Sequence, residues 1–325
     1  MANAKILALG HYVPQKVYDN AYMESIVDTT DEWIIRRTGI EERHISADDE
    51  YTTDMATKAA QEAIRKANIS VEDIDLIILG TVTPDYFTPA GACVIQKNLG
   101  AVNAAAFDYN AACTGFIAGT VMAKSFIESG AFKTILVVCA DVLSKVTDYK
   151  DRGTCVLFGD AAGAAIIQAS EETGIIQTVM GADGTGWDAI TSLAVKNDEE
   201  EIEKRVSKRK ETVLMAGQAV MKFAVKAMAD ASNLVLEKAG MTYDDIDLVV
   251  PHQANYRIVD SAIKRMNIDE SKIYLTLKHY GNTSASCIPV ALSKAADEGR
   301  IKKGDKILIV GFGGGLTWGA SIFEF

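Results

Sequence analysis

The stretch Ser70-Val-Glu-Asp-Ile-Asp-Leu-Ile-Ile78 has a near copy later in the chain, Thr242-Tyr-Asp-Asp-Ile-Asp-Leu-Val-Val250. In each copy an acidic turn leads into a short apolar run that is typical of a buried strand. An amphipathic helical pattern precedes each copy, over residues 53–67 and 220–239. Helical patterns that alternate with buried strands predict an α/β fold.

A second pair of apolar runs supports a repeat, Thr134–Cys139 and Lys306–Gly311. The copies in the first pair are 172 residues apart (248 − 76), and those in the second pair are also 172 apart (307 − 135). Two strands that recur at one offset indicate a duplicated architecture. We therefore predict two similar halves, residues 1–172 and 173–325, with a junction near Ser170–Gly174.

Composition narrows the class of protein. The chain has 325 residues, 48% of them apolar and 24% charged, as in soluble globular proteins with a large core. A net charge of -11 argues against a broad nucleic-acid surface. No apolar run has the length of a signal peptide or a membrane span, and the uncharged stretch 307–323 is broken by glycines. The charge run over residues 197–211 is predicted to be an exposed loop or helix.

The cysteines favour a reducing compartment. There are five, an odd number, without a CxxC pair or a cysteine–histidine cluster. A disulfide framework and a structural zinc site are therefore not expected, and we predict a cytoplasmic protein.

Cys113 lies in Phe107-Asp-Tyr-Asn-Ala-Ala-Cys-Thr-Gly-Phe116, where a strand-like run leads into a helical pattern. At a helix N-terminus, free N–H groups and the macrodipole favour thiolate over thiol, so this context predicts a reactive cysteine. The alternative is a small buried core residue, the usual fate of a free cysteine. We expect that fate for the four cysteines inside apolar segments, Cys93, Cys139, Cys155 and Cys287.

His252 directly follows an apolar run, in Pro251-His-Gln-Ala-Asn255. Ligands of α/β sheets are usually bound at the carboxyl ends of strands. A lone histidine is more often structural than catalytic, but this polar cluster at a strand end favours a functional role.

Asn282 lies in Tyr280-Gly-Asn-Thr-Ser-Ala-Ser286, between a predicted strand over residues 273–277 and a predicted helix over residues 284–296. One interpretation is a helix N-cap, for which asparagine is a preferred residue. The other is an amide that donates a hydrogen bond into the same cavity as His252.

The chain closes on Gly311-Phe-Gly-Gly-Gly-Leu-Thr-Trp-Gly319. It is not a phosphate-binding P-loop, because the Lys-Ser/Thr ending and the GxGxxG spacing are both missing. Consecutive glycines after a strand let backbone N–H groups approach a ligand, so the run is either a tight turn or part of an oxyanion hole.

Together these motifs resemble the β-ketoacyl-acyl carrier protein synthase III family, which belongs to the thiolase-fold superfamily. Each motif alone is weakly specific, but four in the matching order are highly specific. The likeness runs from Lys5 to the last residue. It implies a five-layered αβαβα sandwich of two pseudo-symmetric halves, normally a homodimer, in agreement with the repeat. The motifs are Ala112–Phe116, Pro251–Asn255, Gly281–Ala285 and Gly311–Gly319.

The resemblance implies a decarboxylative condensation that initiates fatty acid synthesis. Cys113 is expected to take the acyl group from an acyl-CoA. His252 and Asn282 would then stabilise the oxyanion that forms when malonyl-acyl carrier protein loses carbon dioxide. Gly314 would contribute to the oxyanion hole, and Phe312 would lie beside the decarboxylation site. Decarboxylation drives the reaction, so neither a metal nor a redox cofactor is expected.

Further positions match the family's substrate contacts. Gln218 stands where asparagine is expected, which puts that one contact in doubt. Phe87 resembles the residue that crosses the dimer to line the partner's acyl pocket. The positions that match CoA contacts are Thr29, Trp33, Arg37, Arg152, Gly217 and Asn255.

A basic stripe supports an acidic partner. Arg257, Lys264 and Arg265 are spaced so that they share one face of the helix after His252. On a chain of net charge -11, such a stripe fits acyl carrier protein, which is acidic. The alternative is an ordinary solvated helix face. Lys222 and Gln253 are expected to belong to the same docking surface.

Other functions remain open on sequence alone. A related thiolase-fold enzyme of polyketide or alkylquinolone synthesis would keep the same three residues. A cysteine hydrolase explains Asn282 less well, and a non-catalytic acyl-CoA-binding protein has no need of Cys113. The sequence does not decide whether the primer is acetyl, a longer straight chain or a branched chain.

Overall fold

The structure of the chain is a computed structural model that describes residues 2–193 and 212–325. The charge run over residues 197–211 lies outside the described residues. The strands are β1 (Asn3–Tyr12), β2 (Lys16–Asp19), β3 (Glu42–Ile45), β4 (Leu76–Gly80), β5 (Ala105–Tyr109), β6 (Thr134–Asp141), β7 (Ala161–Ser170), β8 (Ile175–Ala182), β9 (Ile190–Thr191), β10 (Leu214–Met215), β11 (Leu248–Pro251), β12 (Lys306–Gly313) and β13 (Thr317–Glu324). The α-helices are α1 (Asn20–Ile26), α2 (Asp31–Thr38), α3 (Thr52–Ala67), α4 (Gly91–Leu99), α5 (Gly115–Glu128), α6 (Arg152–Cys155), α8 (Gly217–Ala239), α9 (Tyr256–Met266), α10 (Leu277–Tyr280) and α11 (Cys287–Asp297).

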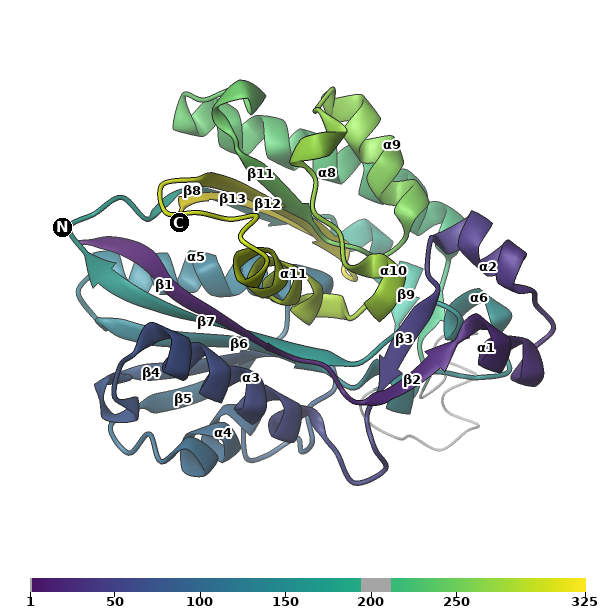
Figure 1. Cartoon of the computed structure of the whole chain (residues 1–325), viewed down its shortest axis with the longest axis horizontal. Helices are drawn as coiled ribbons and strands as arrows, with labels where there is room; N and C mark the ends of the chain where they lie inside the picture. The colour runs from purple at the N-terminus through teal and green to yellow at the C-terminus, as the bar shows by residue number, and fades with distance from the viewer. Residues whose placement is uncertain (1, 194–211) are drawn as a thin grey trace.

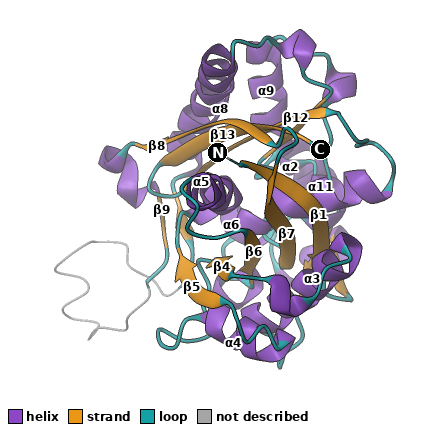
Figure 2. Cartoon of the chain, turned by 90° about the vertical axis from the view of Figure 1, so that its left-hand side faces the viewer, coloured by secondary structure: helices purple, strands orange, loops and turns teal. Residues whose placement is uncertain are grey.

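Two large sheets and three layers of helices make up the fold. One sheet has the strand order β1-β7-β6-β4-β5 and the other β11-β12-β13-β8. Helices α5 and α11 lie between the sheets, α3 and α4 cover the outer face of the first, and α8 and α9 cover that of the second (Figure 1). Figure 2 shows α5 with β8 and β13 on one side and β4 to β6 on the other. These layers confirm the predicted αβαβα sandwich.

The repeat seen in the sequence reappears as strand pairing. Leu76 of β4 pairs in parallel with Ile135 of β6, and Leu248 of β11 pairs in parallel with Ile307 of β12. The predicted equivalent residues therefore occupy equivalent places in the two sheets. Strands β4, β6 and β11 are buried along their whole length, because helices cover both faces of each sheet.

The connection between the sheets is short. The predicted junction near Ser170–Gly174 falls between the end of β7 and the start of β8. The division into residues 1–172 and 173–325 stays a prediction. Among the described residues, no helix is long and apolar enough to cross a membrane.

The strand predicted over residues 273–277 is wrong. Only Ile273 forms a bridge, in parallel with Val249 of β11, and the chain then turns into α10. The backbone N–H groups of Thr276 and Leu277 donate to the Gln253 side chain instead of to a neighbouring strand. This segment lies at the edge of the second sheet that corresponds to the position of β5 in the first. Here the Gln253 side chain, rather than a paired strand, accepts the backbone hydrogen bonds.

Candidate active site

Cys113 lies on a tight turn between β5 and the buried helix α5. The Asn110 side-chain oxygen accepts a hydrogen bond from the backbone N–H of Ala112, at 3.0 Å. Ala112 has a φ of 46°, a left-handed conformation that costs a residue with a side chain roughly 1–2 kcal/mol. This strained turn presents Cys113 two residues before the start of α5. Helix α5 itself lies between the two sheets (Figure 1).

A second turn of the same form faces the first. The Asn282 side-chain oxygen accepts from the backbone N–H of Ser284, at 2.9 Å, and Ser284 has a φ of 54°. Its hydroxyl lies 3.6 Å from the sulfur of Cys113. The two turns obey the offset of the repeat, since 282 − 110 and 284 − 112 are both 172. We call them the first elbow (residues 110–113) and the second elbow (residues 282–285).

His252 is fully buried at the end of β11. Its backbone N–H donates to the carbonyl of Val310 at 2.7 Å, and its ring meets Phe312 edge to face with centroids 5.1 Å apart. The Nδ1 atom lies 2.8 Å from the sulfur of Cys287, whereas the buried Nε2 atom has no partner in the protein. Burial lowers the pKa of His252 to about 3, so the imidazole is neutral at physiological pH.

The Cys287 thiol decides which nitrogen of His252 carries the proton. Burial raises the pKa of Cys287 well above its usual range, so the thiol keeps its hydrogen and can donate it to Nδ1. The proton of the neutral ring must then be on Nε2. In Asn282 the oxygen is occupied by Ser284, which leaves the amide hydrogens as donors. His252 and Asn282 therefore both present donors, the requirement for stabilising an oxyanion.

The glycine-rich run closes over the first elbow. A side chain on Gly313 would place its Cβ 2.7 Å from the backbone nitrogen of Cys113, a separation that only glycine permits. The hydroxyls of Thr114 and Thr317 are hydrogen-bonded at 3.0 Å, which ties the elbow to β13. A Cβ on Gly314 would lie 3.7 Å from that of Ala112, so the predicted oxyanion-hole residue borders the same elbow.

Burial opposes the thiolate form of Cys113 that the helix N-terminus favours. Burial raises the pKa of Cys113 to about 12, a hydrogen bond from Ser284 lowers it in part, and the charge of Asp141 raises it further. The helix N-terminus stabilises the anion, but the surrounding protein penalises it more strongly. Cys113 thus carries its proton at neutral pH and must lose it during attack.

Three of the predicted CoA contacts lie together at the surface. The guanidinium of Arg152 lies 4.7 Å from the Trp33 ring centroid, and that of Arg37 lies 5.9 Å from it. Arg152 also donates to the carbonyl of Asp28 at 2.8 Å. The Thr29 hydroxyl is buried without a partner. This corner combines an aromatic face, cations and a free hydroxyl, which suits an adenine nucleotide.

A cavity of about 490 Å³ adjoins this corner and is lined by Arg36, Arg37 and Arg257. Gly217 is the exposed first residue of α8, and Asn255 is the N-cap of α9, where its side chain accepts from the backbone N–H of Arg257. The Asn255 side-chain oxygen therefore already has a structural role.

The predicted docking surface is mostly exposed. Arg257, Lys264 and Arg265 lie on the solvent face of α9, and Lys222 is exposed on α8, which packs against α9. Lys264 forms an ion pair with Asp260 at 2.9 Å.

Gln253 is the exception, and its assignment to the docking surface is wrong. It is 0% exposed, and its side-chain oxygen accepts the backbone N–H groups of Thr276 and Leu277 at 2.6 and 2.8 Å. Buried backbone donors need an acceptor, and Gln253 supplies it.

One loop residue and one residue of α4 face solvent. Phe87 is 74% exposed, an unusual place for an aromatic side chain. Cys93 is exposed as well, contrary to the expected core position, whereas Cys139, Cys155 and Cys287 are buried as predicted.

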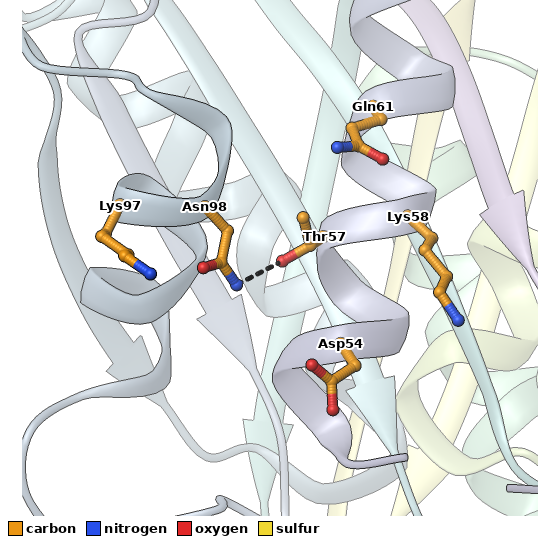
Figure 3. A pocket seen from close by; sticks show the side chains of 6 residues that line it. All are labelled: Asp54, Thr57, Lys58, Gln61, Lys97 and Asn98. Carbon is orange, nitrogen blue, oxygen red and sulfur yellow. Dashed lines mark hydrogen bonds between the residues drawn. The ribbon is translucent and has the colours of Figure 1, made fainter. Parts of the chain in front are cut away.

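Two further clusters lie apart from these residues. A groove between α3 and α4 is lined by polar side chains, none of them a predicted site residue (Figure 3). Among the described residues, His11, Glu62 and Asp297 are close enough to share a metal ion. The Lys66 ammonium lies 3.2 Å from Glu62 and 2.6 Å from Asp297. Both carboxylates are therefore already paired with a positive charge, in the place that a metal ion would take.

Three residues of the site were missed by the sequence analysis: Asp141, Ser284 and Cys287. A signal for Ser284 was present, because it is one repeat length from Ala112 in the first elbow. Asp141 ends the strand predicted over residues 134–139, where polar residues often serve a site. Cys287 offered no signal beyond its residue type.

The duplicated five-layered fold, with Cys113 on one elbow in contact with Ser284 of the other, is that of the thiolase class of condensing enzymes. The family models of 3-oxoacyl-[acyl-carrier-protein] synthase III match residues 107–184, and those of its C-terminal part match residues 236–325. The chain belongs to the β-ketoacyl-acyl carrier protein synthase III family.

Its relatives match along almost the whole chain. The β-ketoacyl-[acyl-carrier-protein] synthase III of Clostridioides difficile (strain 630) is 50% identical over 99% of this chain and 98% of its own. That of Clostridium acetobutylicum is 49% identical over 100% and 99%. The crystal structure of 3-oxoacyl-[acyl-carrier-protein] synthase III from Aquifex aeolicus superposes with a TM-score of 0.92, at 44% identity, over 99% of this chain and 100% of that one.

Proposed function

We propose that this protein condenses an acyl-CoA primer with malonyl-acyl carrier protein, giving β-ketoacyl-acyl carrier protein, CoA and carbon dioxide. This reaction initiates fatty acid synthesis. The observation that carries the proposal is the meeting of the two elbows, with the Cys113 sulfur 3.6 Å from Ser284 and the unpartnered Nε2 of His252 in the buried site. No metal or redox cofactor enters the reaction, because loss of carbon dioxide supplies the carbanion.

In the first half-reaction, the Cys113 sulfur attacks the thioester carbonyl of acyl-CoA. The carbonyl oxygen becomes an oxyanion, which the backbone N–H groups of Cys113 and of the run containing Gly314 stabilise. The close approach of Gly313 to the backbone nitrogen of Cys113 supports this assignment. Departure of CoA leaves the acyl group on the sulfur. The elbow limits the motion of Cys113 and so keeps the attack geometry fixed.

In the second half-reaction, the malonyl thioester carbonyl accepts hydrogen bonds from Nε2 of His252 and the amide of Asn282. Loss of carbon dioxide moves negative charge onto that oxygen, where both donors stabilise it. The low pKa of His252 suits this role, because a neutral imidazole donates without giving up its proton. The ring of Phe312 against His252 excludes water from the carbanion. The carbanion then attacks the acyl group on Cys113.

The CoA nucleotide is assigned to the corner formed by Trp33, Arg37 and Arg152. A purine ring would stack with Trp33 and the guanidinium of Arg152, which now lie 4.7 Å apart and would have to separate. Thr29, Gly217 and Asn255 belong to the same proposed substrate path.

Acyl carrier protein is assigned to the exposed basic stripe of Arg257, Lys264 and Arg265, with Lys222 beside it. An acidic partner gains association rate and orientation from such a surface. We also propose a cytoplasmic homodimer in which Phe87 enters the partner's acyl pocket, which would explain its exposure in a single chain.

Incubation with labelled acetyl-CoA tests the proposal. We expect label on Cys113 and free CoA in solution, followed by a β-ketoacyl product when malonyl-acyl carrier protein is added. Retention of CoA without acyl transfer would indicate a binding protein, and release of free acetate would indicate a hydrolase.

A priming enzyme of polyketide synthesis is the second candidate. The priming β-ketosynthase of the R1128 polyketide pathway superposes with a TM-score of 0.92, at 33% identity, over 99% of this chain. A panel of straight and branched acyl-CoA primers, each tested with the carrier proteins of both pathways, separates the two.

A further inference from the structure

Asp141 is a buried carboxylate that the reaction described above does not use. It lies at the end of β6 with 0% exposure, and no cation is paired with it in the part of the chain that the structure describes. One oxygen accepts from the Thr81 hydroxyl at 3.0 Å and the Val82 N–H at 2.7 Å. The other faces the second elbow, 3.4 Å from the backbone nitrogen of Ala285.

The Ser284 hydroxyl stands between this carboxylate and the nucleophile. It lies 3.6 Å from the Cys113 sulfur, and it is close enough to Asp141 to offset part of the rise that burial causes in the pKa of that carboxyl. A hydroxyl can accept one hydrogen bond while it donates another. Ser284 is 2% exposed and is held by its own backbone hydrogen bond to Asn282. Ser284 therefore has both the Cys113 sulfur and the Asp141 carboxylate as neighbours.

We propose that Ser284 and Asp141 remove the proton of Cys113 during acyl transfer, an inference that rests on the proposed function. As the sulfur attacks the thioester carbon, its S–H bond breaks and the proton passes to the Ser284 oxygen. The Ser284 O–H bond breaks at the same time, and that proton passes to the Asp141 carboxylate. When the carbon–sulfur bond to CoA breaks, the proton returns through Ser284 to the leaving CoA sulfur. Serine and aspartate end the step as they began it.

The surroundings fit a base. Burial raises the pKa of Asp141 and of Cys113, so a neutral thiol faces a carboxylate that is more basic than one in water. A neutral His252 whose Nδ1 is occupied and whose Nε2 carries the proton has no lone pair for the thiol. Among the described carboxylates, Asp141 is the one that neighbours Ser284, the residue in contact with the sulfur.

The experiment follows alkylation of Cys113 by iodoacetamide against pH, together with its acylation by acetyl-CoA. We expect Asp141→Asn and Ser284→Ala to slow both reactions about a hundredfold at neutral pH. Both variants should also lose the acidic limb of the pH profile, where wild-type rates fall as Asp141 takes up a proton. A purely structural carboxylate would lower thermal stability without moving that limb. Unchanged or faster alkylation in Asp141→Asn would overturn the proposal, because removing a negative charge alone makes thiolate easier to form.

Matched variants separate the path from general effects of mutation. Asp160 is another buried carboxylate that accepts from a serine, Ser144, and Ser286 is a buried serine on the same turn that donates to the Thr283 carbonyl. Asp160→Asn and Ser286→Ala are expected to keep wild-type alkylation rates within about twofold. Equal losses in these controls would count against the proposal.

A wild-type measurement covers the case in which Asp141→Asn fails to fold. Two protons move in one step, so the acylation rate should depend quadratically on the deuterium fraction of the solvent, and linearly in Ser284→Ala. A linear dependence in wild type would refute the relay. Alkylation needs no acyl donor, so it tests the relay separately from the proposed function. If wild type reacts with iodoacetamide through this path but not with acetyl-CoA, the proposed function is refuted and the relay is supported.

Discussion

The two elbows have the same backbone and different chemistry. In both, an asparagine oxygen accepts the N–H group two residues ahead. The first residue of the 3-10 turn that follows is left-handed, with φ of 46° in Ala112 and 54° in Ser284. The first elbow carries the nucleophile, Cys113, and the equivalent residue of the second is Ala285. Asn282 is buried against the site, whereas Asn110 is exposed.

The strand ends differ in the same way. Gly80 ends β4, and a side chain there would meet the Tyr109 ring at 2.8 Å. The equivalent residue one repeat length later is His252. Gly311 leaves space for its side chain, because a Cβ on Gly311 would lie 3.2 Å from that of His252. The comparison teaches that a duplicated scaffold divides the work, with the nucleophile in one half and the oxyanion donors in the other.

Exchange of the nucleophile is expected to have the largest effect. Cys113→Ala should reduce acyl transfer from acetyl-CoA by at least about a thousandfold, because Ala285 of the second elbow offers no replacement. Mass spectrometry of the protein after incubation with acetyl-CoA measures this. Cys155→Ala, at a buried cysteine outside the elbows, is the control and should be acylated normally. Acyl groups on a different residue would break the comparison.

Removal of the donors of the second half should have the next largest effect. We expect His252→Ala and Asn282→Ala each to lower condensation about a hundredfold, since each removes one hydrogen bond to the developing oxyanion. Acylation of Cys113 should stay within about threefold of wild type, because those donors serve the malonyl thioester. Separate assays of the two half-reactions measure this. Equal damage to acylation in both variants would contradict the division of labour.

The donor to His252 should have a smaller effect. Cys287→Ala removes the group that fixes the proton on Nε2, and we expect condensation to fall about tenfold. Cys287→Ser restores a donor to Nδ1 and should recover most of the activity. The 15N chemical shifts of the imidazole identify the tautomer directly. A wild-type ring protonated on Nδ1 would refute the assignment.

The last prediction concerns stability rather than rate, and it is a dependence on pH. Because burial lowers the pKa of His252 to about 3 from 6.5, the unfolded chain binds a proton between these values that the folded chain does not. The stability contributed by the neutral ring is therefore present above pH 6.5 and lost as the pH falls toward 3, by up to about 1.4 kcal/mol per pH unit. Urea unfolding at several pH values measures this. The free energy of unfolding should fall less steeply with decreasing pH in His252→Asn than in wild type. If the free energy of unfolding falls equally steeply with decreasing pH in both proteins, the His252 ring is protonated in the folded state and the prediction is wrong.

Much of this arrangement follows from local sequence. The repeat of two strand patterns at one offset predicted which residues are equivalent, and in the structure Leu76 pairs with Ile135 as Leu248 pairs with Ile307. His252 was singled out by its position after a strand. Such features depend on residues close together in the chain, where periodicity and turn chemistry act.

Features that depend on tertiary packing were missed by the sequence analysis. Gln253, beside His252, was assigned to the docking surface, but two buried backbone N–H groups near residue 276 require its oxygen. Cys113 was expected as a thiolate from its helix terminus, yet burial raises its pKa to about 12. Neither the burial of a side chain nor its distant partners can be read from a local pattern.

The sequence by itself determined the α/β class, the duplication and the residue types of the site, because strand burial and turn formation are local. Tertiary structure decided which groups meet. The contact of Cys113 with Ser284, and that of His252 with Cys287, join residues that are 171 and 35 positions apart. Only the stacking of two sheets around α5 and α11 brings them together, and the protonation state of each group follows from that burial.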